Sequence, residues 1–310
     1  MKLSLIVPCY NEVDNVSALQ DAIISTFSSC GYDYEIIFVD DGSTDGTFDK
    51  LRMIHNAQKC PVKVLRFSRN FGKESAIFAG LKHAVGDYIA LIDADLQQPP
   101  EVVRMMVQTL DDQPECDVVA AYQDRRNEGA FLKFYKKCFY RLINHLSDIS
   151  LHRDASDFRT FRRCVAESIL SLGEYHRFSK GLFAWIGYST AFIPYTAAKR
   201  NAGKSKWSFF KLLNYAIEGI IGYSTKPLRI ATFLGGLTSF ASLAYMIVVV
   251  LQKLIQGIDV PGYATIIVLI LLLGGMQLFC IGIIGEYVGK AFEQSKNRPI
   301  YITKDFLNYE

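Results

Sequence analysis

Two aspartates separated by one small residue, Asp93 and Asp95, follow a short apolar run and are candidates for a metal site. Two carboxylates so close together repel each other unless a cation lies between them. A hard divalent ion such as Mg²⁺ or Mn²⁺ prefers oxygen ligands and keeps coordination positions open for substrate phosphates. The amide oxygen of Gln97 could be a further ligand. Because a D-x-D triplet is frequent on protein surfaces, its place in the fold must support this interpretation.

Polar residues also follow two other strand-like runs. Pro8, Tyr10 and Glu12 come after the first run, and Asp40 comes after the second. Any one acidic loop could be a turn or a helix N-cap, and that interpretation suits residues 43–45, which precede a helical segment. Since three loops carry such groups, a shared binding site is the better interpretation.

Basic residues that could hold phosphate lie in two segments nearer the C-terminus. Arg177 lies in HRFSKG, and Arg200 and Lys206 lie in RNAGKSKW. Guanidinium and ammonium groups pair well with phosphate oxygens. A solvated surface or attraction to anionic lipid is an equally open interpretation from composition alone.

Strand-like and helix-like segments alternate in the first part of the chain. The strand-like runs are short and rich in β-branched or aromatic residues: 3–8, 35–39, 62–67 and 88–92. The helix-like segments lie between them, near 13–29, 45–58 and 72–84. This alternation predicts a mostly parallel sheet with helices on both faces. Such sheets bind ligands beyond the carboxyl ends of their strands, where the candidate residues are expected.

After Arg229 the chain becomes almost continuously apolar. Residues 230–252 and 263–285 contain no charged side chain, and a membrane-spanning helix needs about 20 apolar residues. Two buried core helices are a less favourable alternative for uncharged runs of this length. Because Lys and Arg flank the outer ends of the two runs, the positive-inside bias predicts a hairpin with the N-terminal domain and both termini in the cytoplasm.

Two more segments have apolar residues at helical spacing and are candidates for helices in the membrane interface. Residues 130–149 carry basic side chains between the apolar ones, and residues 207–223 directly precede the first span. The core of a soluble domain is an equally good interpretation of the first segment.

The composition of the whole chain excludes several classes of protein. The 310 residues are half hydrophobic, and the net charge of +3 without a long basic run argues against a nucleic-acid partner. Seven scattered cysteines without a CxxC pair argue against a disulfide framework or a zinc site and fit a reducing cytosol. The first apolar run is too short for a signal peptide.

In this order, the segments resemble the family 2 glycosyltransferases with the GT-A fold, in the branch of dolichyl-phosphate mannose synthase-like and polyprenyl-phosphate glycosyltransferases. The resemblance covers nearly the whole chain through IVPCYNE, VDDGSTDGT, SRNFGKESA, ALIDADLQQPPE, DFRTFRR, HRFSKG, GKSKW and the two spans. It implies a Rossmann-like α/β catalytic domain at 1–206, a juxtamembrane helix at 207–228, two transmembrane helices at 229–288 and a cytosolic tail at 289–310.

The resemblance also implies roles for matching residues of the donor site. Four are expected to hold the nucleoside, with the last reading the base: Pro8, Tyr10, Glu12 and Asp40. Three are expected at the metal and diphosphate, the second with a catalytic role: Asp93, Asp95 and Gln97. Two basic residues are expected to engage the donor diphosphate: Arg200 and Lys206.

For the acceptor side, Asp157 resembles a catalytic or sugar-contacting carboxylate of this branch. An acceptor phosphate is already anionic at neutral pH and does not obviously need a base, so orienting a sugar hydroxyl is an alternative role. Arg159 and Arg177 are expected to contact the acceptor phosphate. Gln123 stands where the family pattern has an arginine, and Arg125 or its neighbour is expected to substitute.

The function implied is inverting transfer of a sugar from a nucleotide-sugar, UDP rather than GDP, to a polyprenyl phosphate, undecaprenyl rather than dolichyl. The sugar is not identified, and a homo-oligomer is left open. One alternative is a processive polysaccharide synthase, but the Q-x-x-R-W motif and additional spans of those enzymes are not visible. The other is a non-catalytic membrane scaffold, against which the intact acidic residues of the three loops argue.

Overall fold

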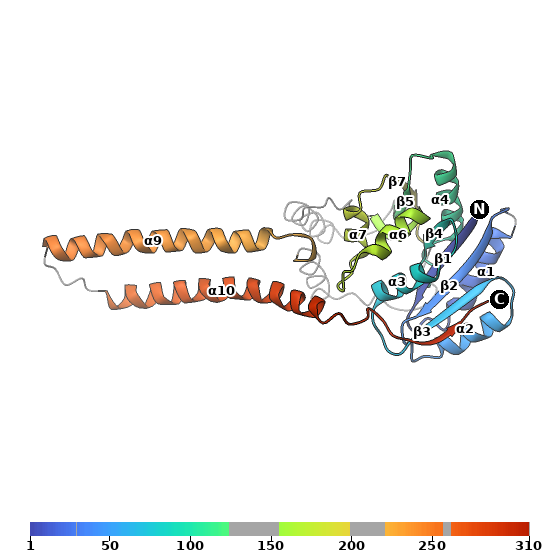
Figure 1. The fold of residues 1–310 in the computed structure, drawn as a ribbon, viewed down its shortest axis with the longest axis horizontal. Helices are drawn as coiled ribbons and strands as arrows, with labels where there is room; N and C mark the ends of the chain where they lie inside the picture. Colours follow the sequence, from blue (N-terminus) through green and yellow to red (C-terminus); the bar gives the residue numbers. More distant parts are fainter. Residues whose placement is uncertain (29, 124–154, 199–220, 257–261, 310) are drawn as a thin grey trace.

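The computed structural model describes residues 1–28, 30–123, 155–198, 221–256 and 262–309. It consists of an α/β domain from which two long helices project side by side (Figure 1). The N-terminus and the C-terminal segment both lie in the α/β domain, at the end of the molecule far from the tips of these helices (Figure 1). The chain therefore leaves the domain, runs through the helical hairpin and returns.

Eight strands form one mixed sheet in the described part of the chain, in the order β7-β5-β6-β4-β1-β2-β3-β8. Their bounds are β1 Lys2–Cys9, β2 Asp33–Asp40, β3 Val62–Phe67, β4 Tyr88–Leu91, β5 Val118–Gln123, β6 Ala155–Arg162, β7 Thr190–Tyr195 and β8 Thr303–Leu307. Strands β1 to β4 are parallel neighbours, whereas β6 is antiparallel to β4 and β5, and β8 is antiparallel to β3. The predicted Rossmann-like sheet of the GT-A fold is confirmed.

Helices cover both faces of this sheet. Their bounds are α1 Val16–Phe27, α2 Thr47–Asn56, α3 Lys73–His83, α4 Pro100–Asp112, α6 Arg163–Ser171, α7 Ser179–Trp185, α9 Lys226–Gln256 and α10 Tyr263–Ser295. Alternate residues of β2 point to opposite faces, so Phe38 packs with α1, α2 and α4 while Val39 packs with α3 and α6. Both cores are fully buried, which explains why the central strands are apolar at nearly every position.

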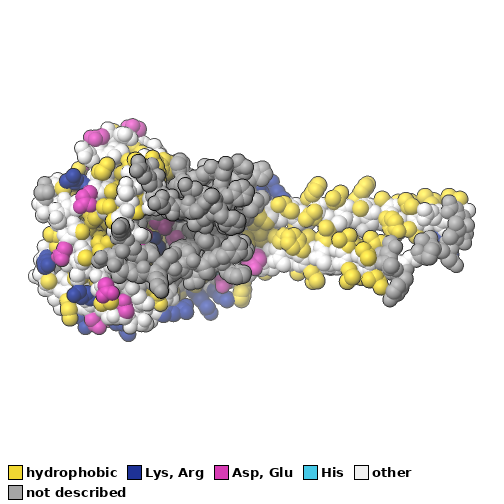
Figure 2. All heavy atoms as spheres, turned by 180° about the vertical axis from the view of Figure 1, so that it is seen from behind, with side chains coloured by type: hydrophobic (Ala, Val, Ile, Leu, Met, Phe, Trp, Pro, Cys, Tyr) yellow, Lys and Arg dark blue, Asp and Glu magenta, His cyan; other side chains and the backbone are white. Residues whose placement is uncertain are grey.

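The two C-terminal helices are longer than the apolar runs that predict them. Helix α9 extends beyond 230–252 at both ends, and α10 extends beyond 263–285 by almost three turns at its C-terminal end. Both are long and apolar enough to cross a membrane, and many of their apolar side chains are exposed along the described parts of the projecting hairpin (Figure 2). This exposure is typical of helices that lie in lipid. That the domain faces the cytoplasm stays a prediction.

The C-terminal residues do more than form the predicted tail. After α10 the chain returns to the sheet, where Ser68 N donates to Ile302 O and the Tyr301 ring stacks on Phe67 at 4.8 Å between centroids. Strand β8 then pairs with β3, which covers an edge that would otherwise be open. This strand has only five residues, so its pattern is too short to be recognised from sequence. Its partner β3 is also distant in the chain, so no hairpin signal links the two strands.

Candidate active site

The loops that follow β1 and β2 are fastened to each other. Asn11 N donates to Ser43 Oγ at 2.9 Å, and Thr44 N donates back to Asn11 Oδ1 at 3.0 Å. Glu12 N donates to Thr47 Oγ1 at 2.9 Å. Asn11 adopts a left-handed backbone conformation with φ of 56°, which asparagine tolerates better than most residues. These contacts hold the predicted nucleoside-binding residues Pro8, Tyr10, Glu12 and Asp40 at one rim of the sheet.

Asp40, the residue expected to read the base, has no exposed surface. Its Oδ1 accepts a hydrogen bond from Ser43 N at 3.0 Å, and Arg66 Nε lies 3.7 Å from its Oδ2. Oδ2 has no hydrogen-bond partner among the described residues. Burial raises the pKa of Asp40, while the bonds from Ser43 and the charge of Arg66 act in the opposite direction. Neighbouring side chains therefore cover this carboxylate completely.

Asp41 fastens the loop after β2 to the loop after β3. Its carboxylate accepts hydrogen bonds from Phe71 N at 2.6 Å and from Gly72 N at 2.9 Å. Gly42 has φ of +68°, and a Cβ there would lie 2.5 Å from the carbonyl carbon of Arg69. Burial raises the pKa of Asp41 to about 6. The two loops are therefore locked by a buried carboxylate and a glycine that no other residue can replace without strain.

The predicted metal-binding aspartates follow β4 at the same rim. Gln98 holds Asp93 at two points, because its Oε1 accepts from Asp93 N at 2.8 Å and its Nε2 donates to Asp93 Oδ2 at 3.0 Å. Asp95 Oδ1 accepts from the backbone N–H of Gln97 at 3.2 Å. Gln97 was expected at this site from the sequence, whereas its neighbour Gln98 is the buried side chain of the pair.

These two carboxylates suit a divalent cation that takes most of its ligands from the substrate. No group of three or more His, Cys, Asp or Glu side chains that could hold a metal is found in the described parts of the chain. Mg²⁺ and similar ions are usually bound by one or two carboxylates together with substrate phosphates and water, so Asp93 and Asp95 meet the requirement. The arrangement differs from a structural metal site, in which the protein supplies all the ligands.

Lys73, the first residue of α3, joins the carboxylate predicted to bind metal to the carboxylate predicted to be catalytic. Its Nζ lies 2.6 Å from Asp93 Oδ1 and 3.5 Å from Asp157 Oδ2. Burial alone would lower the pKa of Lys73, but the negative charges of Asp93 and Asp157 raise it well above its ordinary value. The side chain is still 42% exposed, so the ammonium group can reach a ligand. Lys73 belongs to SRNFGKESA, yet the sequence alone did not indicate its role.

Asp157 reaches Lys73 because β6 runs antiparallel to β4. Leu91 pairs with Arg159, so the chain two residues before Arg159 meets the chain two residues after Leu91, where Asp93 lies. Burial would raise the pKa of Asp157, but the positive charges of Lys73, Lys180 and Arg159 lower it below its ordinary value, in that order of effect. Oδ1 is buried without a hydrogen-bond partner in the described residues. Asp157 is therefore an ionised acceptor at neutral pH.

The two arginines predicted to contact the acceptor phosphate differ in how far their side chains are buried. Arg159 is only 4% exposed, and its guanidinium lies 4.0 Å from the centre of the Phe183 ring. Arg177 donates to the carbonyl oxygens of Ile169 and Leu172 at the C-terminal end of α6, at 2.9 and 3.0 Å. A guanidinium has five N–H donors, so Arg177 keeps donors for a ligand. Both roles stay predictions, and Arg177 is the more accessible.

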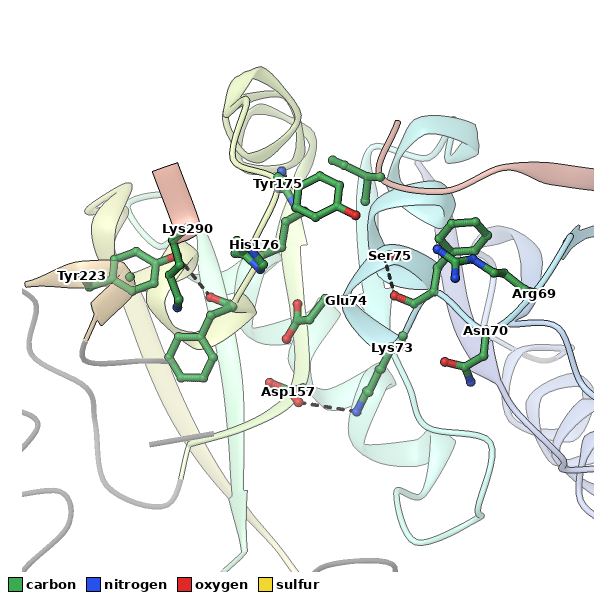
Figure 3. Close-up of a pocket in the computed structure, with 16 residues that line it drawn as sticks. Arg69, Asn70, Lys73, Glu74, Ser75, Asp157, Tyr175, His176, Tyr223 and Lys290 are labelled. Carbon is green, nitrogen blue, oxygen red and sulfur yellow. Dashed lines mark hydrogen bonds and ion pairs between the residues drawn. The ribbon is translucent and has the colours of Figure 1, made fainter. Parts of the chain in front are cut away.

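A cavity of about 520 Å³ extends from Lys73 and Asp157 toward the bases of α9 and α10 (Figure 3). Its far wall contains Tyr223, just before α9, and Lys290, near the end of α10. Glu74 lies in the cavity, where its carboxylate accepts hydrogen bonds from the backbone and hydroxyl of Ser179. Burial and the charge of Asp157 raise the pKa of Glu74. The cavity thus connects the carboxylate site with the base of the hairpin.

The base of α10 is attached to the segment that lines this cavity. Gln294 accepts from Tyr175 N and donates to Gly173 O, each at 2.8 Å. His176 forms an ion pair or hydrogen bond with Glu293. These contacts join the α/β domain to the hairpin, and the sequence did not indicate them because the partners are more than 100 residues apart.

Several predicted residues and segments lie outside the described residues: Arg125, Arg200, Lys206, the segment 130–149 and most of 207–223. Gln123, which stands in the expected arginine position, is the last residue of β5.

Comparison with known proteins gives two family matches and close relatives. The model of "Glycosyl transferase family 2" matches residues 4–170, and the model of "GtrB C-terminal hairpin" matches residues 226–291. The bactoprenol glucosyl transferase of Shigella phage SfV is 39% identical over 307 residues, which cover 98% of this chain and 99% of that protein. The prophage bactoprenol glucosyl transferase homolog of Escherichia coli K12 is also 39% identical, over 306 residues, with the same coverage.

Among solved structures, glucosyl-3-phosphoglycerate synthase from Mycobacterium tuberculosis in complex with Mn²⁺, UDP-glucose and phosphoglyceric acid has a similar fold. Its TM-score is 0.50 at 19% identity, and the match covers 71% of this chain and 77% of that chain. At this level of identity the likeness concerns the fold alone.

Proposed function

The chain belongs to glycosyl transferase family 2, and from that premise we propose that it transfers a sugar from a nucleotide-sugar to a polyprenyl phosphate at a membrane surface. The observation that carries the proposal is the cavity between Lys73 and Asp157 on one side and Tyr223 and Lys290 on the other. A lipid held in the bilayer can present its phosphate there without leaving the membrane. The names of the relatives from phage SfV and Escherichia coli support the same class of acceptor.

We further propose a UDP-sugar as donor, with glucose as the first sugar to test. The glucosyl transferase names of the relatives support glucose, and the resemblance of the donor loops supports UDP. Tyr10 and Asp40 would contact the base at the ends of β1 and β2. The catalytic domain at 1–206 and both termini would lie in the cytoplasm, where nucleotide-sugars are made, consistent with the basic flanks of the hairpin.

Asp93 and Asp95 would hold Mg²⁺ or Mn²⁺, which when bound neutralises negative charge on the departing nucleoside diphosphate. Gln98 keeps Asp93 in a fixed orientation, as partners of metal ligands commonly do. Lys73, which contacts both Asp93 and Asp157, would stabilise a phosphate oxygen between the donor site and the cavity. Asp157, held ionised by its basic neighbours, would accept a hydrogen bond from a sugar hydroxyl.

The reaction is a direct displacement. An oxygen of the acceptor phosphate forms a bond to the anomeric carbon as the bond from that carbon to the nucleoside diphosphate breaks. The acceptor phosphate is already an anion, so no residue has to remove a proton from it. One displacement inverts the configuration at the anomeric carbon, and an α-linked donor gives a β-linked lipid product.

The experiment is to incubate the purified full-length protein in detergent with undecaprenyl phosphate, Mn²⁺ and UDP-glucose or other nucleotide-sugars, and to analyse the lipid by mass spectrometry and NMR. We expect one hexose per lipid, in the β configuration. An α-linked product contradicts the single displacement. A product with many sugars identifies a processive synthase, and the absence of transfer with any donor supports the non-catalytic scaffold.

A further inference from the structure

Three charged side chains from neighbouring strands form a row at the edge of the donor site. Arg66 on β3 pairs in register with Asp40 on β2 and with Asp305 on β8. Residues paired across neighbouring strands point to the same face of a sheet, so the three side chains share the face that α1 and α2 cover. The Arg66 guanidinium stacks on the ring of Phe48 in α2, 4.5 Å from the ring centroid.

The guanidinium of Arg66 is shared almost equally between the two carboxylates. Its Nε lies 3.7 Å from Asp40 Oδ2, and its Nη1 lies 3.6 Å from Asp305 Oδ2. Both separations exceed a good hydrogen bond, so Arg66 attracts each carboxylate without closing on either. This position leaves Asp40 Oδ2 without a hydrogen bond in the described residues, although the oxygen is buried. A buried carboxylate oxygen left in this state is costly and marks a group that awaits a partner.

We propose that Asp305 is a positioning residue for the donor site: it holds Arg66 back from Asp40, so that Asp40 Oδ2 stays available to the nucleoside. The inference rests on the proposed function and names the segment that completes its donor site. Asp40 is fully buried whereas Asp305 is partly exposed, so Asp305 also offers a place to which Arg66 can move when a base enters.

Strand β8 at the C-terminal end of the chain thereby takes part in donor binding. Asp305 comes after both long helices, and β8 reaches β3 only because the chain returns from the hairpin to the sheet. A nucleoside offers an N–H donor on its base that fits a carboxylate oxygen. The donor site of the N-terminal domain therefore depends on a residue beyond the membrane segments.

The charged and titratable groups that interact with Asp40 are Arg66 on β3, Asp41 and Asp45 in the loop after β2, and Cys9 at the end of β1. Arg66 favours the ionised form of Asp40, whereas Asp45 disfavours it. The charge of Asp40 in turn raises the pKa of Asp41 and of the buried thiol of Cys9 on β1. Arg66 is the cation of this set, so a change in its position changes the protonation of Asp40 most directly.

The test is to titrate full-length protein in detergent with UDP and Mn²⁺ by calorimetry, with GDP as a second probe, across a pH series. Asp305→Asn removes the charge while keeping the shape of the side chain. Lys304→Gln, a charge change at the neighbouring exposed position of β8, is the matched control. Arg66→Gln removes the shared cation. Thermal unfolding of each variant shows whether β8 remains in place.

We expect Asp305→Asn to weaken UDP binding about three- to fivefold, the range for a partly exposed ion pair, with Lys304→Gln unchanged. UDP affinity should fall at acidic pH as Asp40 becomes protonated. In Asp305→Asn, Arg66 closes on Asp40 and favours its ionised form, so this fall in affinity moves to lower pH. In Arg66→Gln the cation is lost, so the fall in affinity moves to higher pH. A merely structural role for Asp305 would not shift the pH dependence of the two variants in opposite directions.

UDP binding by Asp305→Asn that equals the native protein at every pH overturns the inference and leaves the proposed function intact. Weakening that only follows a loss of thermal stability also overturns it. If the native protein binds neither UDP nor GDP, the proposed donor class fails, and the inference fails with it.

Discussion

Lys73 Nζ lies 2.6 Å from Asp93 Oδ1, so an ammonium group on α3 contacts the carboxylate that follows β4. The same nitrogen lies 3.5 Å from Asp157 Oδ2. Lys73 is thus the cation between the predicted metal site and the cavity that leads to the hairpin. A group in this place can stabilise negative charge on either the leaving diphosphate or the arriving phosphate.

Replacing Lys73 with methionine tests this role. We expect Lys73→Met to lower kcat/KM for transfer by about 100-fold, a typical effect of removing one preorganised charge-stabilising group. Lys50→Met, at an exposed position of α2, is the control and should behave like the native protein. Equal activity of the two variants would show that Lys73 has no part in the reaction.

The metal site is tested by Asp95→Asn. We expect the concentration of Mn²⁺ that gives half-maximal turnover to rise by about tenfold or more, since one of two carboxylate ligands is lost. A chelator should abolish turnover by the native protein, and added Mn²⁺ should restore it. Asp14→Asn, an exposed carboxylate in the loop after β1, is the control. An unchanged metal requirement in Asp95→Asn would exclude this residue as a ligand.

The packing of the loops after β2 and β3 is tested with two glycines. Gly42 and Gly46 have φ of +68° and +89°, but a Cβ at Gly42 would lie 2.5 Å from Arg69 backbone, whereas nothing lies within 4 Å of one at Gly46. We expect Gly46→Ala to lower the free energy of unfolding by about 1 kcal/mol and Gly42→Ala by about 3 kcal/mol. Thermal unfolding and UDP affinity measure both. Equal losses would mean that the loops do not touch as described.

The raised pKa of Asp41 predicts that the stability of the fold depends on pH. Burial raises its pKa from an ordinary 3.8 to about 6, so the folded protein binds this proton more tightly than the unfolded chain. The contribution of Asp41 is therefore most favourable below about pH 4 and is lost as the pH rises to about 6. The thermal midpoint of Asp41→Asn, relative to the native protein, should rise over this window. A difference that is constant with pH would contradict the raised pKa.

The alternation of strands and helices was enough to predict a mostly parallel sheet and the rim on which Asp40, Asp93 and Asp95 lie, whereas the GT-A fold was implied by the resemblance of the motifs. Parallel strands place their carboxyl ends together, so residues near the ends of adjacent strands can be grouped from local patterns. The spans were recognisable because lipid requires long apolar runs, although α10 continues well past the apolar part.

Lys73 and Asp305 could not be identified in the same way. Lys73 meets Asp157 only through the antiparallel pairing of β6 with β4, and Asp305 meets Arg66 only because β8 returns to the sheet edge. Such contacts join segments far apart in the chain, and no local periodicity encodes them. Likewise, the burial of Arg159 against Phe183 depends on the packing of α7, which composition does not indicate.

The central claim is that the cavity between Asp157 and Lys290 admits the lipid phosphate. Gly222 lines its membrane end, and a Cβ there would meet open space, so Gly222→Trp fills the cavity without forcing the backbone apart. Gly173→Trp, where a Cβ also meets open space, is the control outside the cavity lining. The decisive measurement is transfer of glucose to undecaprenyl phosphate beside UDP affinity in both variants. The account predicts that Gly222→Trp loses at least about tenfold in transfer while binding UDP like the native protein. Undiminished transfer by Gly222→Trp would contradict it.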